Sequence, residues 1–186
     1  AKLKQACERL WKDVTSRRMY VTAGLGPAAA NEGFTTDYDL PNDTAYAAAI
    51  DSDQLEQWPQ FFTEACHYRV THVDNEREGL PAGVVWADSR AMLEDRVAAL
   101  REANIYERQR YRHLLGTPVV ANADAHGATA RTPFIVARIM ATGETMLFAS
   151  GVYNDRFVNE NGELRLAERV AVCDSSVTDT LMALPL

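Results

Sequence analysis

Two glycine turns divide the second half of the sequence into consecutive strand-like runs, and this pattern restricts the fold more than any other feature. Thr142-Gly143 follows the run PFIVARIMA, and Asn161-Gly162 separates FASGVYNDRF from LRLAERVAVC. Gly and Asn reach positive φ with little strain, so such pairs are typical of hairpin turns. We therefore predict an antiparallel meander of three long strands, with a bulge at Gly151 that bends the middle strand.

Helical periodicity and short β-type runs alternate in the rest of the chain. The first two expected helices span 2–18 and 45–57, and the second of them is capped by Thr44 and ends before Pro59. A third helix is expected after Asp88 or Ser89, where Leu93, Val97 and Leu100 share a face. The expected strands span 67–73, 84–87 and 107–115, with a Gly/Pro-containing segment at 21–43 and a polar loop at 122–129. This order predicts an α+β fold, in which a curved, mostly antiparallel sheet wraps around the helices as a cone.

Composition excludes several classes of partner. The 186 residues carry 26 acidic and 19 basic side chains, a net charge of −7, which has the wrong sign for binding nucleic acid or an anionic membrane. No apolar run approaches the roughly 20 residues of a membrane span, and the start AKLKQACERLWK does not resemble a signal peptide. We therefore expect a cytoplasmic location, with Cys7, Cys66 and Cys173 as reduced, buried thiols.

The histidines and cysteines do not form a ligand set for a metal. His67 and His72 are five residues apart on one strand, so they point to opposite faces. Cys66-His67 is half of a Rieske-type pattern, which uses two Cys and two His, but Cys173 is followed by Asp174 instead of a second His. We expect no metal, cofactor or catalytic residue on this chain.

One catalytic hypothesis remains as an alternative. Tyr68, His67 and Asp155, together with Tyr153, could line the inside of the cone and transfer protons, as in a stand-alone isomerase or dehydratase. The competing interpretation is that all four are ordinary strand residues.

Two further features predict contacts with other subunits. Tyr106, Arg108, Arg110 and Arg112 alternate along one face of a strand, with Tyr111 and His113 on the other, which suits an ion-paired face against neighbouring carboxylates. The end of the chain, from Val177 to Leu186, is apolar and needs a groove in its own domain or in a partner. The expected subunit-interface residues are Arg108, Arg110, Arg112, Tyr111, Leu184 and Leu186.

Long stretches of the chain resemble a known family. The segments AIDSDQLEQWPQFFTEACHYRVTHVDNEREGL, GVVWADSRAMLEDRVAALREANIYERQRYRHLLG, FASGVYNDRF and LRLAERVAVCDSSVTDTLMALPL are similar to the small (β) subunits of aromatic ring-hydroxylating dioxygenases, above all those acting on terephthalate. The resemblance covers about residues 45–186. It implies a nuclear-transport-factor-2-like cone fold and a mainly structural role in an α3β3 hexamer.

The same resemblance implies where the chemistry takes place. In this family the [2Fe-2S] Rieske cluster and the mononuclear Fe(II) are held by the large (α) subunit, and a reductase supplies electrons from NADH. The complex would cis-dihydroxylate an aromatic carboxylate such as terephthalate.

The beginning of the chain resembles a different family. The segment RMYVTAGLGPAAANEGFTTDYDLPNDTAYA is similar to a stretch of β-L-arabinofuranosidase-type glycoside hydrolases. The Glu and Cys of that family's metal-assisted active site align here with Ala48 and Ile50. A carbohydrate-active fragment is thus a third hypothesis, but we expect no glycosidase activity. We expect a first segment at 1–43 and a cone-fold domain at 44–186.

Overall fold

The computed structural model describes residues 43–103, 106–177 and 182–186, and their order of helices and strands confirms an α+β fold. The helices are α2 (Asp43–Asp51), the 3-10 helix η2 (Leu55–Phe61), α3 (Val73–Arg77) and α4 (Arg90–Glu102). The strands are β1 (Phe62–His72), β2 (Val85–Ala87), β3 (Gln109–Leu115), β4 (Val119–Asp124), β5 (Gly127–Met140), β6 (Thr145–Glu160) and β7 (Glu163–Cys173). The helix expected at 2–18 and nearly all of the segment 21–43 lie outside the described residues.

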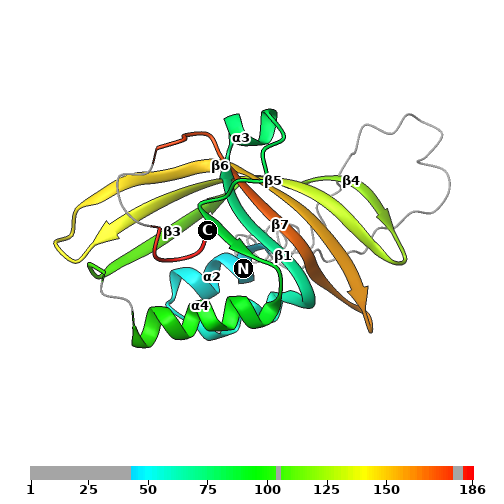
Figure 1. Cartoon of the computed structure of the whole chain (residues 1–186), viewed down its shortest axis with the longest axis horizontal. Helices are drawn as coiled ribbons and strands as arrows, with labels where there is room; N and C mark the ends of the chain where they lie inside the picture. The colour runs from blue at the N-terminus through cyan, green and yellow to red at the C-terminus, as the bar shows by residue number, and fades with distance from the viewer. Residues whose placement is uncertain (1–42, 104–105, 178–181) are drawn as a thin grey trace, which may run out of the picture. The chain divides into compact units, whose positions relative to one another are not determined.

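All seven strands join one mixed sheet in the order β2-β1-β7-β6-β5-β3, with β4 paired to β5. The pairs β5–β6 and β6–β7 are antiparallel, which confirms the predicted meander, whereas β1 pairs with β7 in parallel. Both predicted turns have positive φ, at Gly143 and at Asn161 and Gly162. The sheet curves around α2 and α4, which lie on one of its faces (Figure 1).

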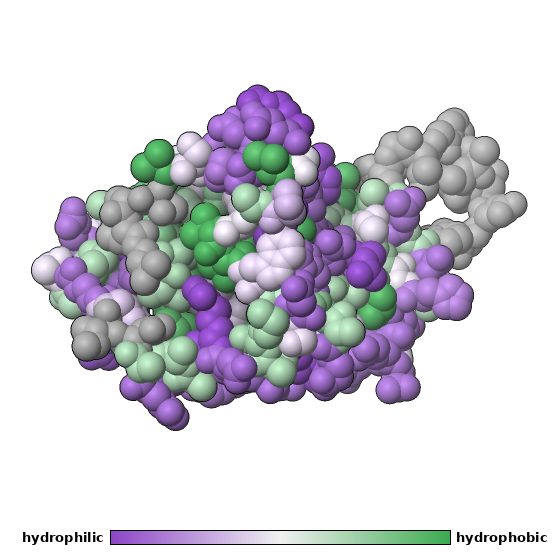
Figure 2. All heavy atoms as spheres, viewed as in Figure 1, coloured by the Kyte–Doolittle hydropathy of each residue, from purple (hydrophilic) through white to green (hydrophobic). Residues whose placement is uncertain are grey.

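Helix α4 forms where the sequence predicts it. The Ser89 side chain accepts a hydrogen bond from the Met92 backbone N–H, so Ser89 is the N-cap. Leu93, Val97 and Leu100 are buried against the core. The short helix α3 buries none of its residues, and the surface over it is strongly hydrophilic (Figure 2).

Several predicted boundaries are wrong. Helix α2 begins at Asp43 and ends at Asp51 instead of reaching 57, because Asp53 has a φ of 58° and the chain continues as a 3-10 helix that contains Pro59. Thr44 is therefore inside the helix and not its cap. Strand β1 begins at Phe62 instead of His67.

The polar loop predicted at 122–129 is mostly strand. β4 and β5 form a hairpin in which the Asp124 side chain accepts hydrogen bonds from the backbone N–H groups of His126 and Gly127. Ala, Asn and Asp have low strand propensity, but pairing with a long neighbouring strand prevails over it.

Gly151 is not a bulge, although it is structurally required. The β5–β6 register shifts between Val136 and Ala137, opposite Phe148, while Gly151 pairs regularly with Phe134 and Cys173. A Cβ at Gly151 would lie 2.1 Å from the Val172 carbonyl oxygen. Glycine is thus needed here for close approach of two backbones.

Candidate functional site

A buried ion cluster occupies the interior of the fold. Arg169 on β7 is fully buried, and its Nε and Nη2 donate to the two carboxylate oxygens of Asp155 on β6 at 2.8 and 2.7 Å. Nη2 also donates to Asp43, the first residue of α2, at 2.5 Å. The guanidinium lies between the rings of Tyr46 and Tyr153, 4.1 and 4.3 Å from their centroids. The cluster therefore links α2, β6 and β7.

The electrostatics of this cluster favour a structural role. Burial by itself would lower the pKa of Arg169. The carboxylates of Asp155 and Asp43 outweigh this effect and raise the pKa above its ordinary value, so the guanidinium remains charged. Burial also raises the pKa of Tyr46, Tyr68 and Tyr153, so these phenols are neutral at physiological pH. Two carboxylates and two rings hold this charge in a fixed position, and among the described residues only Nη1 of its nitrogens has no hydrogen-bond partner.

The last residues of the chain fill the space beside this cluster. The hydroxyls of Tyr46 and Tyr68 both donate to the main-chain oxygen of Leu186, at 2.7 and 3.1 Å, and the Leu186 N–H donates to Tyr68 Oη. Arg96 on α4 donates to the carbonyl oxygens of Met182 and Ala183. The side chains of Leu184 and Leu186 are 5% and 0% exposed. Of the apolar end, residues 182–186 are thus buried within their own domain, whereas Val177 is 76% exposed.

The acid–base residues of the alternative hypothesis do not come together. Tyr68 lies inside and is bonded to Leu186, and Asp155 is bonded to Arg169. His67 is on the opposite face of β1, where its Nδ1 lies 2.8 Å from Asp88 and its ring packs edge-on against Trp86. The geometry therefore does not support a cone-fold isomerase or dehydratase site.

A second carboxylate–histidine pair escaped the sequence analysis. His113 on β3 is buried, with Nδ1 2.7 Å from Asp51 Oδ1, and its backbone N–H also donates to that carboxylate. Asp51 is the last residue of α2, so the pair fixes the end of this helix to the free edge of β3. The contact joins residues 62 positions apart, which no local pattern reveals.

The described residues do not fit an iron or zinc site. No group of three His, Cys, Asp or Glu within them could hold a metal. Cys66 and Cys173 are buried thiols, and burial raises the pKa of Cys66 and raises that of Cys173 to about 11. Both groups are therefore protonated thiols at neutral pH.

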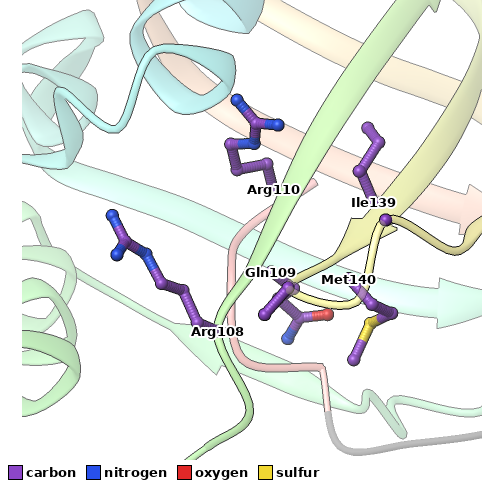
Figure 3. Close-up of a pocket in the computed structure, with 7 residues that line it drawn as sticks. Arg108, Gln109, Arg110, Ile139 and Met140 are labelled. Atoms are coloured by element: carbon purple, nitrogen blue, oxygen red, sulfur yellow. The ribbon is translucent and has the colours of Figure 1, made fainter.

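The predicted arginine face is present. Arg110 and Arg112 are exposed on β3, Arg108 just precedes the strand, and Tyr111 and His113 point inward. Arg108, Gln109 and Arg110 line a shallow pocket of about 330 Å³ with Ile139 and Met140, and Figure 3 shows the two arginine side chains extending in the same direction. Arg112 lies 3.5 Å from Asp51. Within the described residues, Arg108 and Arg110 have no carboxylate partner.

The structure restricts the expected interface. Tyr111, Leu184 and Leu186 are at most 5% exposed in the single chain, so they have no surface left for a partner. We therefore no longer assign these three residues to a subunit interface. The arginines remain candidates for a subunit contact.

Two family models match the chain and meet at α2. A SnoaL-like domain matches residues 44–170, and the catalytic domain of GH127 β-L-arabinofuranosidases matches residues 1–51. A stretch of 58 residues of this chain is also 43% identical to a non-reducing end β-L-arabinofuranosidase of Bifidobacterium longum. That stretch is only 9% of the length of the arabinofuranosidase. No described helix is long and apolar enough to cross a membrane.

The relatives of the larger part agree with one another. Terephthalate 1,2-dioxygenase terminal oxygenase component subunit beta 1 of Comamonas is 68% identical over 142 residues, 76% of this chain and 92% of that protein. The anthranilate 1,2-dioxygenase small subunit of Burkholderia cepacia is 37% identical, covering 76% and 88% of the two chains. A crystal structure of a β subunit assigned to an aromatic-ring-hydroxylating dioxygenase of Novosphingobium aromaticivorans superposes with a TM-score of 0.71, at 36% identity, covering 77% of this chain and 92% of that one. The chain therefore belongs to the family of small (β) subunits of aromatic ring-hydroxylating dioxygenases.

Proposed function

We propose that this chain is the structural β subunit of an α3β3 Rieske dioxygenase that adds both atoms of O2 to an aromatic carboxylate such as terephthalate. The large subunit holds the [2Fe-2S] cluster and the Fe(II), and a reductase delivers electrons from NADH. A cytoplasmic location follows from that supply of NADH. Arg108, Arg110 and Arg112 lie at a contact with another subunit.

One observation carries the proposal: the 68% identity to a terephthalate dioxygenase β subunit extends over 92% of that subunit. The interior of the fold supports the non-catalytic role, because several of its buried polar groups are bonded to the chain's own residues. Tyr46 and Tyr68 donate to Leu186, and Arg169 binds Asp155 and Asp43.

Coexpression with a Rieske large subunit tests the proposal. We expect the chain to copurify with the large subunit of a terephthalate dioxygenase, and the complex with its reductase to form a cis-dihydrodiol from terephthalate. The chain purified alone should be colourless and contain no stoichiometric iron. A chain that carries its own iron, or that does not bind a Rieske large subunit, would contradict the proposal.

A further inference from the structure

A second cavity lies beside the pocket of Figure 3, where the end of α2 meets the start of β3. Its volume is about 440 Å³, within the range of roughly 300–1,000 Å³ that is typical of small-molecule sites. One wall is formed by residues 50–53, and the rest by Tyr106, Arg108, Gln109, Arg110 and Leu184. We call this space the α2–β3 cavity.

One side of the α2–β3 cavity is apolar. The side chains of Ile50 and Leu184 are 2% and 5% exposed, and both belong to the hydrophobic core. The half-buried Tyr106 packs against the same core. A ring of a ligand would therefore be removed from water on this side of the cavity.

The two carboxylates that line the cavity are already paired. Asp51 Oδ1 lies 2.7 Å from His113 Nδ1, and the His113 backbone N–H donates to the same carboxylate. Asp53 Oδ1 accepts a hydrogen bond from Arg101 Nη1 at 2.7 Å. Neither carboxylate is therefore bonded to an arginine of the cavity.

Those arginines have no such partner. Arg108 and Arg110 are exposed and form no ion pair within the part of the chain that the structure describes. Figure 3 shows both side chains on one side of the strand, with Ile139 and Met140 on the other. Two like charges at alternate positions repel each other, and an anion between them would relieve this repulsion. A carboxylate suits them best, because guanidinium groups bind it through paired, charge-assisted hydrogen bonds.

The cavity also contains a hydrogen-bond acceptor without a donor. Gln109 Oε1 is buried and has no hydrogen-bond partner among the described residues. Buried polar atoms are nearly always hydrogen-bonded, so this oxygen indicates a donor that the single chain does not supply. A hydroxyl group is such a donor, whereas a carboxylate can only accept.

We propose that the α2–β3 cavity binds a ring carboxylate that carries a hydroxyl group. The carboxylate lies against Arg108 and Arg110, the ring packs on the side of Ile50 and Leu184, and the hydroxyl donates to Gln109. The proposal rests on the proposed function in one respect: the dihydrodiol of an aromatic carboxylate, which that function forms, belongs to this class of ligand.

Titration of the full chain, followed by NMR of the ligand, measures the binding. The probes are benzoate, 3-hydroxybenzoate and 4-hydroxybenzoate. At least one hydroxybenzoate should bind one site per chain with a dissociation constant below about 1 mM, and about threefold to tenfold more tightly than benzoate. The uncharged 4-hydroxybenzamide should bind at least about tenfold more weakly than 4-hydroxybenzoate. No binding, or equal affinity for benzoate and both hydroxybenzoates, overturns the proposal.

Variants locate the site. Arg108→Gln and Arg110→Gln should each weaken hydroxybenzoate binding about tenfold or more, because each removes a charge-assisted hydrogen bond. Gln109→Leu should abolish the preference for hydroxybenzoate over benzoate and leave benzoate binding in place. The matched control is Arg131→Gln, because Arg131 is exposed on β5, donates to Asn154 and lies outside the cavity.

Circular dichroism verifies that each variant folds, and Arg131→Gln should bind like the wild type. Unchanged binding in both cavity-arginine variants, or a hydroxybenzoate preference that survives Gln109→Leu, contradicts the assignment of this cavity.

The coexpressed complex distinguishes this proposal from the proposed function. Arg108 and Arg110 also belong to the proposed subunit contact, and we expect the cavity to stay open beside it. Hydroxybenzoate binding is therefore compared between complexes that contain the wild-type chain and the Gln109→Leu chain, so that binding to the large subunit cancels. Equal binding by the two complexes would mean that assembly closes the cavity, which overturns the proposal. A complex that forms no dihydrodiol would contradict the proposed function and leave the titration of the full chain standing.

Discussion

A single buried guanidinium joins three elements of the core. Arg169 on β7 binds Asp155 on β6 and Asp43 on α2, between two tyrosine rings. Removing one partner of a buried ion pair is costly because the other charge stays buried without compensation. The start of α2 therefore depends on a residue 126 positions away.

Replacing Arg169 with Met should lower the free energy of unfolding by about 3–5 kcal/mol, since Asp155 and Asp43 would be left facing each other. Urea denaturation of the purified chain measures this. Arg77→Met is the matched control, because its side chain is 71% exposed and, within the described residues, pairs only with Asp74; it should change stability by less than about 0.5 kcal/mol. A loss below about 1 kcal/mol for Arg169→Met would show that the cluster contributes little.

Cys173 should react very slowly with a thiol reagent at pH 8. Its pKa is raised to about 11 by burial and by Asp174, so the reactive thiolate is scarce. Peptide mapping after labelling, with the guanidinium-unfolded chain as control, measures the rate at this residue. Rapid stoichiometric labelling in the folded chain would contradict the burial.

The sequence located part of the interior correctly. The alternative hypothesis placed Tyr68, Tyr153 and Asp155 on the inside of the cone, and all three are buried there. Placing His67 with Tyr68 was wrong, because consecutive residues of a strand point to opposite faces. Arg169 was the partner that sequence reasoning missed; its inward position among apolar residues of the strand next to Asp155 was the available signal.

At the level of elements, turns and long periodic runs were predictable and boundaries were not. Helix α4 and the β5–β7 meander follow from spacing and from Gly turns. The β4–β5 hairpin, the early start of β1 and the parallel β1–β7 pairing depend on contacts distant in sequence. Local propensity carries no information about such contacts.

Gly151→Ala should destabilise the chain by about 2–3 kcal/mol, because the added Cβ would meet the Val172 carbonyl oxygen at 2.1 Å and force β6 and β7 apart. Gly143→Ala is the comparison: nothing lies within 4 Å of its Cβ, and only its φ of 89° opposes alanine, at about 1 kcal/mol. Thermal unfolding of both variants gives the difference. Equal losses of stability in the two variants would mean that β6 and β7 can move apart at little cost in free energy.

At the scale of the whole molecule, two sequence families meet at α2, with family matches at 1–51 and 44–170. Asp43, which the sequence analysis assigned to the first segment, begins α2 and binds Arg169 and Thr132, so it belongs with the cone. We propose that the residues before it are dispensable for the small-subunit role.

Deleting residues 1–42 should leave assembly with the large subunit and dihydrodiol formation within about twofold of the full chain, because the dioxygenase likeness spans about 45–186. Light scattering of the coexpressed complex and product formation check this. A deletion that also removes Asp43 should be less stable, since it takes a carboxylate from Arg169. Loss of the complex on deletion of 1–42 would make that segment an integral contact.

The central claim is that this chain supports assembly and takes no part in the chemistry, and turnover of a Tyr68→Phe complex tests it most directly. Tyr68 is one of the residues that the alternative acid–base hypothesis names, and its change to Phe loses hydrogen bonds to Leu186 that are worth about 1–2 kcal/mol of stability. Activity is therefore normalised to intact complex isolated by size exclusion. The account predicts turnover per complex within about twofold of wild type. Intact complexes with turnover lowered about a hundredfold, equivalent to about 2.7 kcal/mol of transition-state stabilisation, would contradict it.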